Sequence, residues 1–400
     1  MNLYYCLPVI KIVLIIWRFF LYTTDSLLLF NSVPARNPSA KKKVLIIRLD
    51  VIGDFILWLD SAKEYKKLYP EENYQLTLLG NMVWKDIADN LPFFDTFIFF
   101  ERKKFLRNPF YRYRLLKQIF NTGFDIVIQP RYSREFIIED AFVRTCKAPE
   151  RIGIYSNHSK SNKVLKRFSN RWYTTLIRKP EENLPELKRN ENFVQILGAK
   201  NFKAGIPKLL INKNVLNTFE NLPNNYYILS PGAGDRWREW PAQNFSQLAD
   251  KIYNYCGLTG IICGSLSDRT VSHRIISQSS SKLLDFAGLT SLSELIAIIN
   301  QARFIVTNES AAIHIAASVD TPSVCVLGGG HYGRFMPYDN SISHTGHLPI
   351  SVIYKMDCFM CNWKNKSCTR KNTVAPCVEK ISIDSVWNKT QNIIETYKQK

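Results

Sequence analysis

The sequence predicts an α/β protein with two doubly wound parallel-sheet domains, Rossmann-like in layout, that face a cleft. Three observations support this prediction. Short apolar runs alternate with stretches of helical periodicity along most of the chain. The alternation breaks around residues 207–225 and then begins again. The 400 residues, 46% of them hydrophobic, are enough for two cores. We therefore expect domains at residues 41–205 and 206–400, preceded by an N-terminal segment at 1–40.

The N-terminal segment is strongly apolar but carries three charges, Lys11, Arg18 and Asp25, spaced seven apart. A helix would place them on one face, and no uncharged run reaches the roughly 18–20 residues of a spanning helix. No small-residue cleavage site follows, which argues against a signal peptide. The pattern predicts a helix in the membrane surface; a helix packed on the protein itself is the alternative. Residues 31–43 are expected to be a linker.

The first half begins with a buried strand at 43–49, a turn, and a helix to about residue 69. Four further strands are predicted, separated by helical stretches: 74–79, 96–100, 125–129 and 151–155. The helical stretches fall near 81–90, 109–121, 134–146 and 186–198. The basic segment 158–179 has no clear periodicity and is predicted to be a loop.

The first turn, Asp50-Val51-Ile52-Gly53-Asp54, has one glycine and two acids. A dinucleotide-binding turn would instead be glycine-rich and free of acids, because a carboxylate repels a phosphate. An acid at the mouth of a cleft is suited to general-base work. The alternative is that Asp50 or Asp54 only caps the helix.

The second half repeats the alternation, with strands at 226–230, 260–263, 283–286, 304–307 and 323–327. Helices are predicted at 241–255, 268–280, 291–301 and 311–318. After its first strand comes PGAGDRWREWP, in which small residues admit an oxyanion and Arg238 offers a charged fork. The alternative is a surface turn with incidental arginines. Gly328, Gly330 and Gly333 match G-x-G-x-x-G, but Arg334-Phe335-Met336-Pro337 follows instead of a helix, so they do not predict a dinucleotide site.

Polar side chains cluster where the strand 304–307 meets the next helix. Glu309, Ser310 and His314 lie within the first two turns, and a helix N-terminus attracts anions. These residues predict a phosphate site. The alternatives are that Ser310 caps the helix and that His314 is a hydrogen-bonded core histidine.

The charge and the cysteines limit the partners. A net charge of +19 favours an anionic partner. The chain lacks nucleic-acid-binding signatures, so a membrane surface and a phosphorylated substrate are favoured over nucleic acid. The last four cysteines, Cys358, Cys361, Cys368 and Cys377, form C-x2-C-x6-C-x8-C. This spacing permits a zinc site, but reduced thiols that pin a loop are the favoured interpretation.

Several motifs together resemble glycosyltransferase family 9, the heptosyltransferases of lipopolysaccharide core assembly. They are VLIIRLDVIGDFIL, SPGAGDRWREWP, CGSLSDR and VTNESAAIHIAASVDTPSVCVLG, and the resemblance extends from about residue 42 to the C-terminus. It implies a GT-B fold and an inverting transfer of a heptose or related sugar. The donor would be a nucleotide-diphosphate sugar similar to ADP-heptose, and the acceptor a lipopolysaccharide core or similar glycolipid.

The resemblance also implies roles for individual residues. Asp54 would deprotonate the acceptor hydroxyl. Arg238 and the backbone at Ala233–Gly234 would hold the diphosphate, and Asp268 would contact the ribose. Glu309 would bind the sugar hydroxyls. The phosphate side of the donor would meet Ser310, Ala311 and His314. No Asp-x-Asp occurs in the chain, so neither a metal nor a cofactor is expected.

Three positions depart from the family pattern: Asp268 replaces Glu, Glu309 replaces Asp and Ala311 replaces Gly. These changes reshape the pocket beside the sugar, so the donor need not be a heptose. A nucleotide-sugar epimerase on the same scaffold and a non-catalytic phosphoglycan-binding protein are alternative interpretations. The expected location is cytoplasmic, peripheral on the inner face of the inner membrane.

Overall fold

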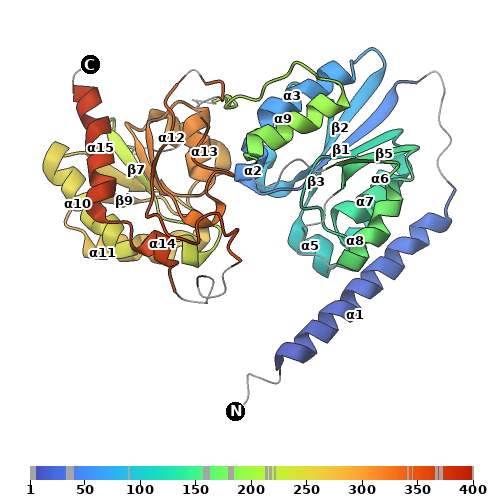
Figure 1. Ribbon diagram of the computed structural model, residues 1–400, viewed down its shortest axis with the longest axis horizontal. Coiled ribbons are helices and arrows are strands. Elements are labelled where there is room, and N and C mark those ends of the chain that lie inside the picture. The colour runs from blue at the N-terminus through green and yellow to red at the C-terminus, as the bar shows by residue number, and fades with distance from the viewer. Residues whose placement is uncertain are drawn as a thin grey trace. The chain divides into compact units, whose positions relative to one another are not determined.

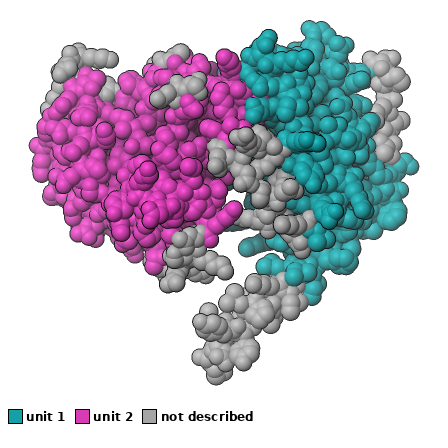
Figure 2. All heavy atoms as spheres, in the orientation of Figure 1, with its two compact units in different colours: residues 1–51, 62–182, 192–202 teal, residues 52–61, 183–191, 203–400 magenta. Residues whose placement is uncertain are grey.

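The chain forms two compact units, which Figure 2 shows in teal and magenta. The computed structural model describes residues 6–32, 40–88, 91–155, 163–178, 184–211, 215, 219, 222–339, 342–344, 346–364, 368 and 373–398. Unit 1 comprises residues 1–51, 62–182 and 192–202, and unit 2 comprises 52–61, 183–191 and 203–400. Two short segments from the first half of the sequence, 52–61 and 183–191, therefore belong to unit 2.

Unit 1 is built on a six-stranded parallel sheet with the strand order β3-β2-β1-β4-β5-β6. Its strands are β1 (Lys42–Arg48), β2 (Tyr74–Asn81), β3 (Thr96–Phe100), β4 (Ile126–Gln129), β5 (Glu150–Tyr155) and β6 (Thr175–Arg178). Val44, Leu45, Ile46 and Ile47 in the central strand are all fully buried. Such a continuous apolar run is typical of a parallel strand covered by helices on both faces.

Most helices of unit 1 lie between successive parallel strands, whereas the first precedes β1 and the last follows β6 (Figure 1). They are α1 (Cys6–Ser26), α3 (Leu59–Leu68), α4 (Lys85–Ala88), α5 (Arg102–Arg107), α6 (Pro109–Thr122), α7 (Glu139–Cys146), α8 (Lys163–Ser169) and α9 (Glu186–Leu197); α3 and α9 begin with residues of unit 2. Local sequence sets several boundaries. The Asn108 side chain caps α6 ahead of Pro109, and Gly123 ends that helix at φ 66°.

Unit 2 repeats the same topology, with the strand order β12-β11-β10-β7-β8-β9. Its strands are β7 (Tyr226–Ser230), β8 (Thr259–Ile262), β9 (Leu283–Asp285), β10 (Ile305–Asn308), β11 (Ser323–Val326) and β12 (Ile350–Val352). Its helices are α2 (Ile52–Ile56), α10 (Ala242–Cys256), α11 (Arg269–Gln278), α12 (Leu292–Gln301), α13 (Ala311–Ser318), α14 (Pro376–Glu379) and α15 (Ile383–Lys398). In each sheet the chain adds strands first toward one edge and then toward the other. The switch lies between β1 and β4 in unit 1 and between β7 and β10 in unit 2. In open α/β sheets ligands bind at such switch points.

The predicted fold class is confirmed, because both units are parallel six-stranded sheets with helices. The predicted loop at 158–179 is wrong for its described residues, since α8 and the edge strand β6 lie there. The single helix predicted up to residue 69 is broken into α2 and α3. Strand β12 was not predicted; it is a short strand at the sheet edge.

The C-terminal half of α1 packs on unit 1. Leu21 in the helix and Leu28 directly after it are fully buried, and the Asp25 carboxylate pairs with Arg112 at 2.7 Å (Nε) and 2.5 Å (Nη2). The spacing predicted that Asp25 and Arg18 share one exposed face of the helix, and this prediction is wrong because Asp25 is buried. The side chain of Lys11 lies outside the described residues. The segment Val13–Phe30 is long and apolar enough to cross a membrane by length and composition.

Candidate functional site

The candidate phosphate site of unit 2 lies at the switch point of its sheet. Strands β7 and β10 pair in parallel, so the loop after each begins at the same sheet edge. Asn308, fully buried at the end of β10, joins the two loops. Its Nδ2 donates to the Pro231 carbonyl at 2.5 Å, and its Oδ1 accepts from the Trp240 amide at 3.1 Å. The Pro231–Pro241 loop is thereby fixed against the start of α13.

Arg238 and Glu309 form the charged centre of this site. Nη2 of Arg238 lies 3.0 Å from Oε2 of Glu309 and also donates to the Glu309 carbonyl at 3.0 Å. Burial raises the pKa of the Glu309 carboxyl, and the nearby Arg238 opposes that shift. Arg238 Nε and Glu309 Oε1 are buried and make no hydrogen bond to the described residues. Buried polar atoms are ordinarily hydrogen-bonded, so these two atoms mark the centre of the candidate site.

Ser310 and His314 have structural contacts within α13. Ser310 caps the helix by accepting a hydrogen bond from the Ala312 amide at 3.3 Å, which is the capping role that the sequence offered as an alternative. Ala311 is the first helical residue. His314 is buried, and its Nδ1 lies 2.7 Å from the Tyr338 hydroxyl. Burial lowers the pKa of His314 to about 3, with a further contribution from Arg238. The imidazole is therefore neutral near pH 7.

The turn that carries Asp54 packs against α13 within unit 2. A Cβ added to Gly53 would lie 3.2 Å from His314 Cδ2 and 3.7 Å from Ala311 Cα, so only glycine permits this approach without displacement. Asp54 follows in the first turn of α2 and is partly exposed. The acid turn of the first sequence half and the phosphate motif of the second are therefore adjacent.

The remaining predicted donor residues lie around the Pro231–Pro241 loop. The Asp268 carboxylate is close to Gly232, where an added Cβ would come within 2.6 Å of it. Asp268 Oδ2 accepts from the Ser265 amide at 2.7 Å and from the Ser265 hydroxyl at 2.8 Å, so it closes a capping box. Gly234 is exposed and its Cα faces the Arg238 guanidinium. Ala233 provides a backbone hydrogen bond to Glu239.

Asp50 does not belong to this site. It is buried in unit 1, where it pairs with Arg48 at 2.6 Å and with Arg131 at 2.5 Å. Among the cysteines of the C-terminal segment, Cys377 Sγ accepts from the Gly329 amide at 3.3 Å. The described cysteines are free thiols, and the described His, Cys, Asp and Glu residues form no group of three or more that could hold a metal ion.

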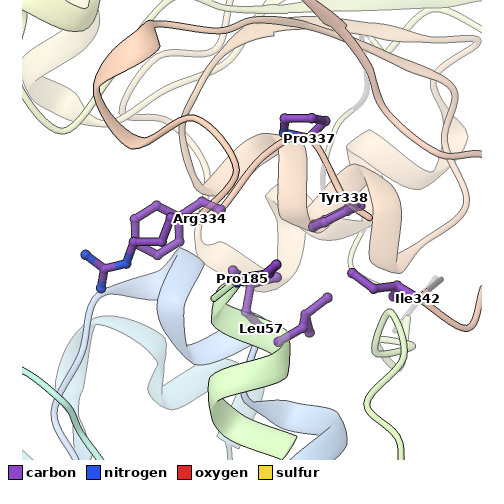
Figure 3. A pocket seen from close by; sticks show the side chains of 8 residues that line it. Leu57, Pro185, Arg334, Pro337, Tyr338 and Ile342 are labelled. Carbon is purple, nitrogen blue, oxygen red and sulfur yellow. The ribbon is translucent and has the colours of Figure 1, made fainter. Parts of the chain in front are cut away.

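Three residues near the site were missed from sequence. Glu239 lies in the Pro231–Pro241 loop, and burial raises the pKa of its carboxyl. Arg334 reaches Glu309 electrostatically and contacts Glu186 Oε2 at 3.2 Å. Tyr338 is one of the residues that line the small hollow shown in Figure 3. That hollow is lined by Leu57, Pro185, Leu187, Arg334, Phe335, Pro337, Tyr338 and Ile342. Tyr338 lies outside helix and strand, so no periodicity marks it.

The buried, neutral state of His314 predicts a dependence of stability on pH. Its pKa is about 6.5 when unfolded and about 3 when folded, so the unfolded chain binds the proton first. Its contribution is complete above pH 6.5 and is lost as pH falls toward 3, by at most about 1.4 kcal/mol per pH unit. Glu309 acts in the opposite direction, because its raised pKa favours the folded state at low pH.

Urea unfolding of the wild type and of His314→Gln between pH 7 and pH 4 measures this contribution. We expect the stability difference between them to shrink as pH falls. His273→Gln is the matched control, because the His273 side chain is 68% exposed. A difference that is independent of pH would contradict a buried neutral His314.

These features define a class of protein: two Rossmann-like units, each with a parallel sheet, and an Arg238–Glu309 pair at the switch point of the second sheet. A solved glycosyl transferase family 9 structure from Veillonella parvula aligns with 90% of this chain and 100% of its own, at TM-score 0.69 and 17% identity. Escherichia coli ADP-heptose lps heptosyltransferase II aligns with 89% and 99%, at TM-score 0.64 and 15% identity. These similarities support a GT-B-like fold.

The model of glycosyltransferase family 9 (heptosyltransferase) matches residues 112–363. The chain belongs to this family, which confirms the resemblance seen in the motifs. Lipopolysaccharide heptosyltransferase 2 of Salmonella typhimurium is 30% identical over 95 residues, which are 23% of this chain and 27% of the relative. The chain thus matches about a quarter of that curated relative's length.

Proposed function

We propose that the protein is an inverting, metal-independent glycosyltransferase. It moves a heptose or related sugar from a nucleotide-diphosphate donor, similar to ADP-heptose, to a lipopolysaccharide core or similar glycolipid. The observation that carries the proposal is the packing of the Gly53-Asp54 turn on α13, beside the Arg238–Glu309 pair. Displacement at a sugar carbon needs a base at the acceptor and charge stabilisation at the leaving group.

In this mechanism Asp54 removes the proton from the acceptor hydroxyl. The hydroxyl oxygen forms a bond to the anomeric carbon as the bond from that carbon to the diphosphate oxygen breaks. The electron pair stays on the diphosphate. Arg238 and the N-terminus of α13 stabilise its charge. Attack opposite the leaving group inverts the anomeric configuration.

The donor residues divide by their position around the phosphate. Backbone at Ala233–Gly234 approaches the diphosphate together with Ser310 and Ala311. In this proposal Asp268 contacts the ribose and Glu309 contacts the sugar hydroxyls, which would supply the partner that its buried Oε1 lacks among the described residues. Neutral His314 lies on the phosphate side of the donor in this proposal, and the Tyr338 hydroxyl holds its ring in place. Glu309 is longer than the aspartate of the family pattern, and Ala311 adds a methyl group where the family has glycine. Both changes reshape the pocket beside the sugar, so the donor sugar in this proposal need not be a heptose.

The proposed acceptor is a glycolipid, so we place the protein in the cytoplasm, peripheral on the inner face of the inner membrane. The partners in this proposal are the nucleotide sugar, the glycolipid and the anionic membrane surface.

The proposal is tested by incubating the protein with radiolabelled ADP-heptose, with and without a lipopolysaccharide core acceptor. We expect label in the lipid fraction only when acceptor is present. Epimerised donor without any acceptor would indicate an epimerase, and donor binding without either product would indicate a binding protein. Both of these outcomes contradict the transferase proposal.

A further inference from the structure

The N-terminal half of α1 differs from the rest of the molecular surface. We infer that it inserts into one leaflet of a bilayer rich in anionic lipid and anchors unit 1 there. This inference deepens the membrane contact of the proposed function, but it stands on the contacts of α1 and not on the transfer chemistry. In Figure 1 this half of the helix extends beyond the body of its unit.

The segment Val13–Ile16 of α1 is exposed and apolar on every side. Val13, Leu14, Ile15 and Ile16 are consecutive residues, each between 49% and 65% exposed. Successive helical residues are about 100° apart, so these four side chains cover the whole circumference. A helix that is apolar all round needs apolar surroundings, whereas a helix lying in the interface keeps one polar face. The hydrocarbon of a bilayer supplies such surroundings.

The C-terminal half of α1 is an integral part of unit 1. Leu21 is fully buried and Asp25 is held by the buried Arg112. Directly after the helix, Leu28 belongs to the apolar core that includes β1 and α7. The Arg112 guanidinium stacks 4.2 Å above the Phe105 ring. Cleavage of α1 would leave Arg112 buried without its carboxylate, at high cost. These contacts fix the C-terminal end of α1 to unit 1.

Aromatic side chains surround α1 where it leaves the body of unit 1. The Trp17 indole donates to the Leu106 carbonyl at 2.7 Å. The Tyr22 ring lies 6.3 Å from both the Phe168 and the Trp172 rings. Tryptophan and tyrosine with one apolar and one polar side concentrate at the headgroup level of membranes. This aromatic belt marks the depth at which unit 1 meets the lipid.

Exposed cations accompany the belt. Arg18 follows Trp17, and Arg107 follows Leu106. Arg167 and Arg171 directly precede the belt residues Phe168 and Trp172. Each is exposed, and such residues attract anionic headgroups. The net charge of +19 reinforces that attraction.

The length of the helix beyond the belt sets the depth of insertion. Residues 6–16 rise about 16 Å at about 1.5 Å per residue. The hydrocarbon core of a bilayer is about 30 Å thick, so this segment reaches through about one leaflet. The described part of the helix before Trp17 therefore spans about one leaflet.

Flotation of the full-length protein tests the inference, since it requires neither donor nor turnover. The vesicles are phosphatidylcholine alone, or phosphatidylcholine in which a third of the lipid is phosphatidylglycerol. We expect the wild type to float with both and more completely with the anionic vesicles. Ile16→Asp should reduce vesicle partition by about tenfold to hundredfold, because a charge in hydrocarbon is costly.

The matched control is Ile196→Asp on α9 of the same unit. Ile196 is 60% exposed, against 62% for Ile16, so both changes should leave folding intact. The double variant Arg107→Glu/Arg167→Glu should lose the preference for anionic vesicles while still binding phosphatidylcholine. The inference is overturned if the wild type does not float, or if Ile16→Asp floats as well as Ile196→Asp. It is also overturned if α1 instead pairs copies of the chain into oligomers that do not float. Failure of sugar transfer alone would leave these results unchanged.

Discussion

Replacing Asp54 with asparagine should lower kcat by about 10²- to 10⁴-fold while leaving the dissociation constant of the donor within a few-fold. A general base acts in the transition state, so its removal slows the chemical step more than it weakens binding. Asp54 is partly exposed in the first turn of α2, and asparagine keeps its shape. Steady-state kinetics and calorimetric titration of the donor measure the two quantities separately.

Asp384→Asn is the matched control for this variant. Asp384 is also an acid in the first turn of a helix, α15, and its side chain is 77% exposed. We expect its kcat to equal that of the wild type. If Asp54→Asn lost donor binding and kcat together, the residue would belong to the donor site and not act as the base.

Replacing Arg238 with methionine should reduce the free energy of unfolding by about 3–5 kcal/mol, because it leaves the Glu309 carboxylate buried without its partner. The donor should bind about tenfold to hundredfold more weakly, since a charged hydrogen bond to the diphosphate is lost. Urea unfolding and donor titration measure these effects. Arg303→Met is the control, because Arg303 is exposed and bonds to Asn225.

A second substitution separates stability from binding. The double variant Arg238→Met/Glu309→Gln removes the uncompensated charge, so most of the lost stability should return. Donor affinity should remain weak, because the cation is still absent. If affinity recovered together with stability, Arg238 would act on the donor only by maintaining the fold.

The parts of the fold predicted from sequence are those with strong local patterns. The run Val44–Ile47 reads as a strand buried on both faces, and it is one. The family resemblance assigned the loop Pro231–Pro241 and Glu309 to one donor site, and the structure brings them together because the parallel strands β7 and β10 end at the same edge. Weak patterns were missed: β6 is an edge strand with two exposed residues among four, so its apolar alternation is incomplete.

Other features depend on contacts between distant parts of the sequence. The turn at Gly53 looks like an ordinary strand-to-helix connection of the first half, and only its packing on His314 assigns it to unit 2. The spacing of Arg18 and Asp25 predicted one polar stripe, but the buried Arg112, 87 residues away, determines where Asp25 points. Tyr338 holds His314 from an irregular segment that carries no periodic signal.

The anomeric configuration of the product tests the central claim most directly. Nuclear magnetic resonance of the sugar transferred from an α- or β-linked donor of known configuration gives the answer in one measurement. A single displacement, with Asp54 at the acceptor and Arg238 at the leaving group, predicts a product of the opposite configuration. A product with the configuration of the donor would contradict the account, because retention requires a different arrangement of nucleophile and leaving group.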